Sequence, residues 1–568
     1  FMTLLLAGSY FFAPAQQPLE KIQRVADKII DNTPFAFRLE VNQPNEYFDF
    51  IEVINFGQTY GNNPGLAYAY TEIDAPREME MDIQVSHNDA LSIYLNGIKV
   101  YEKQGERPVK LVRGERAMEF EFEFPVNLKK GKNILVLKSS TDGDGKWISY
   151  LQPKGSLIFD ESSNENKPKI GFTNNKYVGI EVTALSNWLM LGPFPEDQQL
   201  TEEPLQKLTI GAMYPSGDES VTWTLPKINV FGNVMDGHPL WGSYYNYNYH
   251  TGGVAWAMMH LAEVTGREKY DDFAKTYTDF HIETKPFIGH QVYELNGFRS
   301  VNHHLFETPL LDFTLAPSLP YIYRVMRDPD FPMRDEYVKW VDRIAEYALE
   351  EQLRSPEGHY YRLTPVTYTT WVDDMFMGLP FLMHLADYTE DQTAKKQIYN
   401  DVTNQFFAFN EQVWVPEAKL YQHAQYSDEK VKMPYWSRAN GWGIWATSEI
   451  LLRLPKGHKD YKKILKHFRT HVASIVKYQN TEGFWYNVVD KPESGNETSG
   501  TAIITLAIAR GINEGWLSRN KFEQNVLKGW EALASMIEDD GTVHGICMGT
   551  MCSEDLDYYL NRPILDDD

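Results

Sequence analysis

Two adjacent carboxylates, Asp373 and Asp374, follow Trp371 and precede an apolar segment that continues to Leu385. A carboxyl group that is partly buried beside another negative charge has a raised pKa and can serve as a general acid or base. The apolar segment is typical of a buried helix, and negative charge is favoured at the N-terminus of a helix. The pair therefore has two interpretations, a helix cap or a catalytic carboxylate, and Trp371 is either a core residue or a stacking platform for a ligand.

The chain has 568 residues, of which 43% are apolar and 14% aromatic, which is enough for two or three domains with sizeable cores. The formal net charge of −24 argues against nucleic acid and anionic membranes as partners. It also means that local cations must hold any anionic substrate against the field of the whole protein. The two cysteines, Cys547 and Cys552, give no disulfide framework, and their spacing does not match a zinc site.

Residues 1–15 are predicted to be part of a secretory signal peptide. Residues 2–13 are apolar and uncharged, and the small residues Ala13 and Ala15 mark a candidate cleavage site. The charged start of such a signal is missing and the sequence begins with Phe1, so we expect it to be clipped upstream. A membrane-spanning helix is the alternative, but the apolar run is too short. The prediction is export to the periplasm or to the outside of the cell.

A helix and an all-β region are predicted next. Residues 16–34 place their apolar side chains on one helical face, and Pro34 ends the pattern. Residues 35–195 change to a period of two, which predicts an antiparallel β-sandwich domain. Its alternating runs are 78–86, 91–95, 118–124 and 134–137. The domain resembles the jelly-roll modules attached to many carbohydrate enzymes, which either brace the enzyme or bind glycan.

The remainder of the chain is predicted to be a linker and a helical domain. Residues 196–240 are rich in turn residues and form the linker, and residues 241–568 form the helical domain. Five apolar helices are each followed by an amphipathic one, which predicts a closed toroid with the apolar helices as its inner ring. The predicted pairs are roughly 252–281, 309–354, 374–413, 441–480 and 499–538.

Seven short motifs follow one another along the helical region. They are Tyr249-His250-Thr-Gly-Gly, Leu311-Asp312, Trp371-Val-Asp373, Leu420-Tyr-Gln-His423, Trp436-Ser-Arg438-Ala-Asn-Gly-Trp442, Glu497-Thr-Ser-Gly500 and Gly545-Ile-Cys547-Met-Gly-Thr550. Any one of them is weak, but in this order they resemble glycoside hydrolase family 105, the unsaturated rhamnogalacturonyl hydrolases. The resemblance covers about the last three hundred residues. It implies an (α/α)6-barrel catalytic domain beside the antiparallel β-sandwich.

Two departures from the family pattern carry information. The family often has a histidine shortly before the Trp-x-Asp motif, where this chain has Arg362, and His359 lies nearby out of register. The family also continues into one more helix that closes the ring, whereas this chain stops at Asp568. Residues 16–34 resemble the family's first barrel helix. We therefore expect the β-sandwich to be inserted between the first and second barrel helices, and the sequence to be clipped at its C-terminus.

The resemblance implies a substrate with a 4,5-unsaturated uronic acid at its non-reducing end, the product of a polysaccharide lyase. One acid would protonate C4 and water would add at C5, so the usual carboxylate pair of glycosidases is not required. Asp373 is the expected acid, and Asp312 is expected to face the site and orient water or a hydroxyl. Asp374 is expected to be a helix-end residue that points away. The residues expected to bind substrate are Trp371, Arg438, Trp442, His423, Tyr249 and Arg362.

Other functions remain open from the residues alone. The first is another toroid enzyme, a polysaccharide lyase or a sugar epimerase, although no Tyr/His or Lys base motif for a lyase stands out. The second is a glycan-binding protein without activity, which would lack the catalytic acid. The proposed chemistry needs no metal and no organic cofactor, and adjacent His303 and His304 are discounted as metal ligands because their side chains diverge on most backbones.

Overall fold

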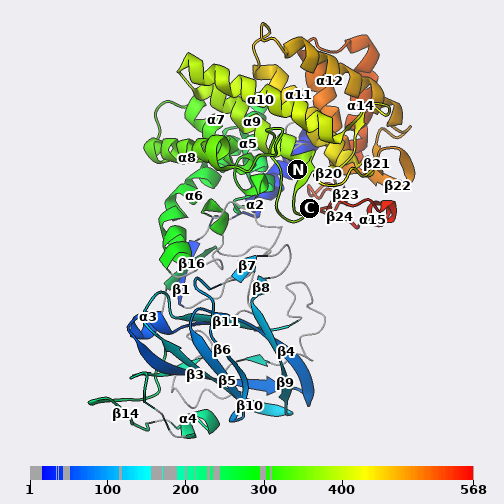
Figure 1. Ribbon diagram of the computed structural model, residues 1–568. Helices are drawn as coiled ribbons and strands as arrows, with labels where there is room; N and C mark the ends of the chain where they lie inside the picture. The colour runs from blue at the N-terminus through cyan, green and yellow to red at the C-terminus, as the bar shows by residue number, and fades with distance from the viewer. Residues whose placement is uncertain are drawn as a thin grey trace. The chain divides into compact units, whose positions relative to one another are not determined.

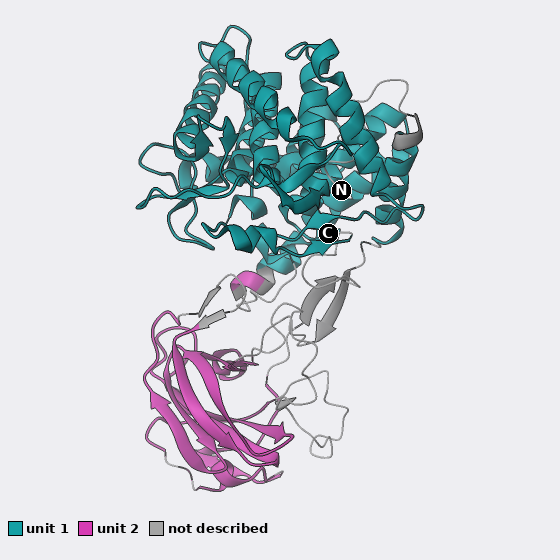
Figure 2. Cartoon of the chain, turned by 90° about the vertical axis from the view of Figure 1, so that its right-hand side faces the viewer, with its two compact units in different colours: residues 1–36, 234–289, 302–568 teal, residues 37–233, 290–301 magenta. Residues whose placement is uncertain are grey.

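The chain divides into two compact units, each described here by itself (Figure 2). One unit comprises residues 1–36, 234–289 and 302–568, and the other comprises 37–233 and 290–301. The computed structural model describes residues 16–33, 35, 37–41, 52–109, 111–113, 118–154, 169–170, 188–198, 200, 202–209, 211–226, 230–234, 244–294, 302–306 and 310–566. The predicted signal peptide, residues 1–15, lies outside the described residues.

The described part of the smaller unit has two main antiparallel sheets. One has the strand order β12 (Lys169–Ile170), β3 (Gly65–Ala75), β10 (Gly131–Thr141), β5 (Ala90–Leu95) and β6 (Ile98–Lys103), with β13 (Leu189–Phe194) also paired to β3. The other has the order β2 (Glu52–Asn55), β11 (Ile148–Pro153), β4 (Met79–His87) and β9 (Phe122–Leu128). The smaller elements are β1 (Phe37–Val41), α3 (Phe56–Tyr60), β7 (Leu111–Arg113), β8 (Met118–Phe120), α4 (Glu203–Gln206), β14 (Tyr214–Ser216), β15 (Glu219–Val221) and β16 (Val230–Val234).

The two sheets share one hydrophobic core. Leu135 and Leu137 of β10 lie in the same buried cluster as Ile83 and Val85 of β4, so the alternating side chains of each sheet meet those of the other. The expected single strand 118–124 is wrong, because the chain changes partner at Glu121. The amide of Glu121 donates to the Ser86 hydroxyl at 2.9 Å, and β8 pairs with β7 while β9 pairs with β4.

The region expected to be a linker contributes to a second core. Tyr214 and Trp223 pack with Tyr70 and Val136, which point away from the first core on β3 and β10. The hairpin of β14 and β15 therefore covers the outer face of the six-stranded sheet with aromatic side chains. This burial was not evident from composition, because turn residues dominate the segment.

The larger unit has a first helix, α2, and then five helical pairs within its described residues (Figure 1). The pairs are α5 (Tyr249–Thr265) with α6 (Glu268–Glu294), α7 (Leu319–Arg327) with α8 (Arg334–Glu346), α9 (Asp373–Tyr388) with α10 (Gln392–Val413), α11 (Ser437–Arg453) with α12 (Tyr461–Ile475), and α13 (Thr498–Asn513) with α14 (Arg519–Ser535). Helix α2 spans Gln16–Asp31 and is anchored on α14, where Lys21 Nζ donates to the carbonyl oxygens of Ala534 and Ile537 at 2.6 and 2.9 Å.

The first helix of each pair is buried and the second is amphipathic. Helices α5, α7, α9, α11 and α13 pack against one another in chain order. Close packing explains small residues at some positions: a Cβ on Gly378 of α9 would lie 2.8 Å from the ring of Tyr360. The second pair is shorter than expected because 3₁₀ turns at Leu311–Phe313 and Ala316–Ser318 precede α7, and Pro317 and Pro320 cannot donate backbone hydrogen bonds there.

Short elements connect the helices near their ends. They are η4 (His303–Leu305), the π turn Tyr347–Glu351, β17 (Thr369–Trp371), β18 (Trp414–Val415), β19 (Leu420–Tyr421), β20 (Ala424–Tyr426), η8 (Val476–Tyr478), β21 (Trp485–Val488), β22 (Lys491–Glu497), β23 (Ile546–Cys547), α15 (Leu556–Leu560) and β24 (Ile564–Leu565). Among the helices of the described residues, none combines the length and the apolar composition needed to cross a bilayer.

Candidate active site

A two-stranded sheet places Asp373 beside His423. Strand β17 pairs antiparallel with β20, with Trp371 opposite Ala424. The pairing continues past the strand, because the amide of Val372 donates to the carbonyl oxygen of His423 at 3.2 Å. Helix α9 begins at the next residue, Asp373. The two residues, fifty positions apart in sequence, therefore become neighbours through backbone hydrogen bonds.

Asp373 is a nearly buried carboxyl group with an unpaired oxygen. Its side chain is 13% exposed, and Oδ2 lies 3.6 Å from Nε2 of His423. Within the described residues, neither of these two atoms has a hydrogen-bond partner. Burial raises the pKa of Asp373 to about 7; the cation of Arg362 opposes this shift, and the carboxylates of Asp374 and Asp312 add to it. Asp373 is thus protonated in a large fraction of molecules near neutral pH.

His423 is neutral and oriented by Tyr559. Its Nδ1 lies 2.7 Å from the Tyr559 hydroxyl, whose oxygen also accepts from the amide of Ser553 at 3.1 Å. Because the Tyr559 oxygen already accepts from the Ser553 amide, we assign the tyrosine hydrogen to Nδ1 and the imidazole proton to Nε2, on the side of Asp373. Burial, with smaller contributions from the charges of Arg362 and Arg438, lowers the pKa of His423 to about 3. The site therefore has a neutral N–H donor that faces the carboxyl group.

Arg362 joins the other two carboxylates. Its Nε donates to both oxygens of Asp374 at 3.0 and 2.9 Å, and its Nη2 donates to Asp374 at 2.7 Å. The same guanidinium reaches Asp312, in the 3₁₀ turn before α7, with contacts of 3.0 and 3.4 Å. Asp374 is only 1% exposed. Arg362 thus neutralises the negative charges of Asp374 and Asp312. Asp373, the third carboxyl group, has no hydrogen bond from Arg362.

The expectation that Asp374 is a helix-end residue pointing away is wrong. It lies in the first turn of α9, as expected, but α9 has no side-chain cap, and the Asp374 carboxylate is directed to the buried Arg362. A buried carboxylate gains more from a buried guanidinium than from an exposed backbone amide, which explains the outcome. Arg362 was expected to grip the substrate. Its three donor nitrogens already contact protein carboxylates, so it acts on the site through them.

The Trp371 ring packs against Arg362 and His423. It is 3% exposed, the Arg362 guanidinium lies over its ring at 4.6 Å, and the His423 ring meets it edge-on at 5.0 Å. Its indole nitrogen donates to Thr369 at 2.7 Å. Trp371 therefore offers little area for stacking on a sugar. His359, considered out of register, is buried and contacts the Thr370 hydroxyl at 2.8 Å, so it braces the strand that carries Trp371.

Arg438 lies in a second polar cluster at the start of α11. Its Nε donates to Ser499 at 2.8 Å, and its Nη2 contacts the carbonyl oxygen of Cys547 and lies 3.8 Å from Glu497. Glu497 is fully buried and caps α13 by accepting from the amides of Ser499 and Gly500 at 3.0 and 2.5 Å. Sequence reasoning gave Glu497 no role. The sequence does not identify this role, because glutamate is not among the residues preferred at a helix N-cap.

Aromatic residues of α5 and α11 complete the cluster. Tyr249 opens α5, and its ring meets Trp442 edge-on at 6.3 Å. Trp442 is 5% exposed and stacks on Phe376 at 4.9 Å. Burial, with a smaller contribution from the positive charge of Arg438, lowers the pKa of His250 to about 3. The contact between Tyr249 and Trp442 brings the start of α5 to the first turns of α11.

The geometry suits proton transfer by a single acid. Asp373 is the carboxyl group that holds its proton to about pH 7, a neutral histidine faces it, and the neighbouring carboxylates are neutralised by one arginine. The described residues contain no group of three His, Cys, Asp or Glu side chains placed to hold a metal ion. The ring centroids of His303 and His304 in η4 lie 4.0 Å apart, with the two rings tilted by 42°.

Comparison with known proteins gives the family. The model of Glycosyl Hydrolase Family 88 matches residues 233–567. The unsaturated rhamnogalacturonyl hydrolase YesR of Bacillus subtilis is 25% identical over 320 residues, which are 55% of this chain and 83% of that protein. The unsaturated 3S-rhamnoglycuronyl hydrolase of Formosa agariphila is 30% identical over 181 residues, which are 30% of this chain and 48% of that protein, so the match spans about half of its length.

One solved structure illustrates the fold. The crystal structure of a possible member of the family 105 glycoside hydrolases from Klebsiella pneumoniae has a TM-score of 0.50 and 19% sequence identity, and covers 59% of this chain and 81% of that one. The likeness concerns the helical domain, where the family match also lies. Since the family match extends over more than half of the sequence, the chain belongs to Glycosyl Hydrolase Family 88 and is a glycosidase.

Proposed function

We propose that this glycosidase removes a 4,5-unsaturated uronic acid from the non-reducing end of oligosaccharides that a polysaccharide lyase has produced. The names of the relatives from Bacillus and Formosa support this substrate class. The observation that carries the proposal is Asp373, a buried carboxyl group with a pKa of about 7 whose Oδ2 has no hydrogen-bond partner within the described residues. Such an acid suits protonation of an alkene carbon, which demands a group that is still protonated at working pH.

In the proposed reaction, Asp373 gives its proton to C4 of the unsaturated sugar. Water adds at C5, and the Asp373 carboxylate takes a proton from that water, which restores the acid. The resulting hemiketal opens and rearranges, and the bond to the next sugar is lost. His423 and Arg438 would hold the substrate's hydroxyl and carboxylate groups, with Tyr249 and Trp442 beside the ring. Asp312 would orient water or a hydroxyl while Arg362 fixes its position.

The architecture suggests how the chain is organised. We infer that α2 and the five pairs belong to an (α/α)6 barrel, and that the two sheets are a jelly-roll-like sandwich inserted after the first barrel helix. The discontinuous larger unit, residues 1–36, 234–289 and 302–568, supports this insertion. The export predicted from residues 1–15 would fit a protein that meets polysaccharide fragments in the periplasm or outside the cell.

Ultraviolet absorbance tests the proposal. The conjugated double bond of the unsaturated uronate absorbs, and its absorbance should fall when the protein is added to lyase-treated rhamnogalacturonan or ulvan. A saturated analogue should remain intact. Asp373→Asn should leave the absorbance of lyase-treated rhamnogalacturonan and of lyase-treated ulvan unchanged. A rise in absorbance on intact polysaccharide would instead indicate a lyase, and no change with any lyase product would contradict the proposal.

A further inference from the structure

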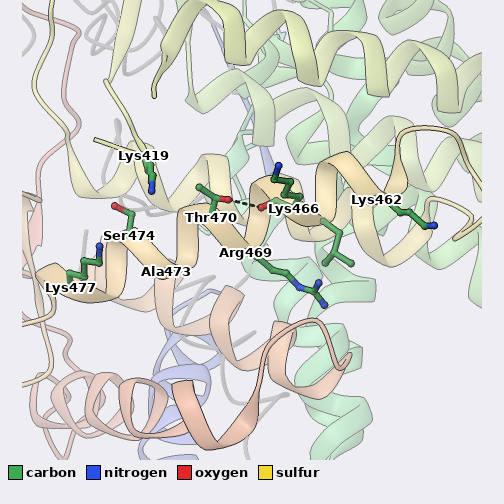
Figure 3. Close-up of a pocket in the computed structure, with 9 residues that line it drawn as sticks. Lys419, Lys462, Lys466, Arg469, Thr470, Ala473, Ser474 and Lys477 are labelled. Carbon is green, nitrogen blue, oxygen red and sulfur yellow. Dashed lines mark hydrogen bonds between the residues drawn. The ribbon is translucent and has the colours of Figure 1, made fainter. Parts of the chain in front are cut away.

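A basic groove follows the outer helix α12, on the wall of the helical unit. It has a volume of about 660 Å³ and is lined by five cations, Lys419, Lys462, Lys466, Arg469 and Lys477, and by no acidic residue (Figure 3). A neighbouring cavity of about 390 Å³ shares Arg469 and adds Lys521. The cations recur along the helix, so the groove extends about 22 Å from Lys462 to Lys477 at 1.5 Å per residue. This volume is typical of sites for small ligands.

These cations have no carboxylate partner in the described part of the chain. None of them forms an ion pair there, whereas Lys463, on the same helix, contacts Asp460 at 3.0 Å. Helix α12 contains no acidic residue at all. Like charges four residues apart, such as Lys462 and Lys466, destabilise a helix. In a protein of net charge −24, an outer helix with uncompensated positive charge indicates a negatively charged ligand.

The groove begins near the end of the unit that carries the active site. Helices α11 and α12 are joined by the short turn 454–460 and pack side by side, so they run antiparallel. The start of α11, with Arg438, and the end of α12, near Lys477, therefore lie at the same end. Lys419 is four residues from His423, which limits their Cα separation to about 14 Å. Ser474 lines the groove, and its hydroxyl donates to the carbonyl oxygen of Ala418 at 2.8 Å. This hydrogen bond holds the segment with Lys419 against α12.

We propose that this groove is an accessory binding site for an anionic oligosaccharide, in which uronate or sulfate groups pair with the lysines. The proposal rests on the proposed function, because the expected substrate is anionic and both site arginines already contact protein carboxylates. A folded protein partner would need a surface of about 1,200–2,000 Å², much more than one narrow groove. A single glycan strand with several acidic groups matches a row of cations that recurs along one helix.

Binding to a probe that the enzyme cannot cleave tests the site. The probe is a fluorescently labelled, saturated rhamnogalacturonan oligosaccharide, followed by anisotropy, and a neutral oligosaccharide of equal length is the comparison. Lys462→Glu with Lys466→Glu should weaken binding of the acidic probe about tenfold or more, since four units of charge change and each exposed pair contributes up to about 1 kcal/mol. Binding should also weaken as salt rises. The neutral probe should not bind the groove.

The matched control makes the same change of charge at two positions outside the groove. Lys339→Glu with Lys528→Glu changes two exposed lysines on α8 and α14, outside the groove, and should bind the probe as the wild type does. A second pair, Lys419→Glu with Lys477→Glu, tests the other end of the groove if the first pair folds poorly. Hydrolysis of an unsaturated disaccharide should stay within about twofold in all variants, because a substrate this short does not reach the groove.

Three results would overturn the site. They are equal binding by the groove variants and the control, equal binding of the acidic and neutral probes, and loss of self-association in the groove variants without any glycan binding by the wild type. The last result would make the groove an interface between copies of the chain. Failure of the proposed function is separable, since inactivity on every unsaturated disaccharide leaves the binding of the saturated probe unaffected.

Discussion

Oδ2 of Asp373 and Nε2 of His423 face each other at 3.6 Å, and within the described residues neither has another hydrogen-bond partner. Buried polar atoms are almost always paired in folded proteins, and leaving one unpaired costs about 1–3 kcal/mol. The pair is therefore poised for a ligand between or beside the two groups. Because the unpaired atoms destabilise the folded state, the titration of Asp373 can be followed through the stability of the protein without substrate.

Asp373→Asn should abolish turnover while it stabilises the free protein at alkaline pH. The amide keeps the shape but cannot donate an acidic proton, so kcat should fall by about 10²–10⁴-fold. The free-energy gain follows from linkage. The folded pKa of about 7 exceeds the value of 3.8 in the unfolded chain, so stability from the protonated form is present below pH 3.8 and is lost as pH rises to about 7.

The measurement is the free energy of unfolding by urea at several pH values. At pH 8 the wild type carries the full penalty of a buried charge, so the variant should be more stable by on the order of 4 kcal/mol, and this difference should nearly vanish by pH 4. Asp335→Asn, which changes an exposed carboxylate in the first turn of α8, is the control for the loss of one negative charge. An equal gain at both pH values would contradict the raised pKa of Asp373.

Activity should decline as pH rises through about 7. The acid form of Asp373 starts the reaction, so kcat/KM should fall about tenfold per pH unit above the pKa of the free enzyme. His423 cannot produce this limb, because its pKa of about 3 leaves it neutral throughout. The check is a pH profile on an unsaturated disaccharide. A profile that is flat to pH 9 would remove Asp373 as the acid.

Much of the helical unit was predictable from local pattern. The apolar stretches of α9, α11 and α13 are buried on nearly all sides, and the ordered motifs predicted Asp373, whose carboxyl group is buried beside His423. Gly378 shows why such patterns are readable, since its packing against Tyr360 leaves no room for a side chain. The apolar residues that produce the helical periodicity are the residues that pack one helix against the next. The periodicity therefore predicts which helices are buried.

The partners of each charge were less predictable, because they come from distant segments. The sequence predicts a helix-end role for Asp374, whereas its carboxylate accepts from Arg362, twelve residues away. Tyr559 contacts His423, which lies 136 positions earlier in the sequence. A capping interaction is local and visible in sequence, whereas a buried ion pair depends on which loops the fold brings together. The same limit applies to Glu497, because both its capping of α13 and its proximity to Arg438 depend on the fold.

Asp374→Asn should shift the pH profile to lower pH. The change removes a negative charge that raises the pKa of Asp373 and frees Arg362, whose charge lowers it. Both effects favour the ionised form of Asp373, so the alkaline limb of kcat/KM should move down by about one unit or more, and activity at pH 7 should drop. Stability should also fall by roughly 3–5 kcal/mol, because a buried cation loses its main partner.

Asp401→Asn is the matched control for that variant. Asp401 accepts from Arg354 at 2.7 and 3.0 Å in a comparable fork, and neither residue belongs to the site. It should lose stability without any change in the pH profile. If Asp374→Asn and Asp401→Asn gave the same profile, Asp374 would have a structural role alone.

Tyr559→Phe should lower kcat about tenfold and lower the free energy of unfolding by roughly 1–3 kcal/mol, because Nδ1 of His423 and the amide of Ser553 lose their partner. The change removes the hydroxyl that donates to Nδ1 of His423, so the imidazole proton is no longer fixed on Nε2, facing Asp373. Tyr558→Phe removes the adjacent hydroxyl, which accepts from the amide of Met551 at 3.0 Å, and should retain nearly full activity. Nitrogen NMR of labelled histidine distinguishes the tautomers, and His423 should change from one tautomer to a mixture in Tyr559→Phe only. An unchanged tautomer with reduced kcat would mean that Tyr559 acts on the substrate and not through His423.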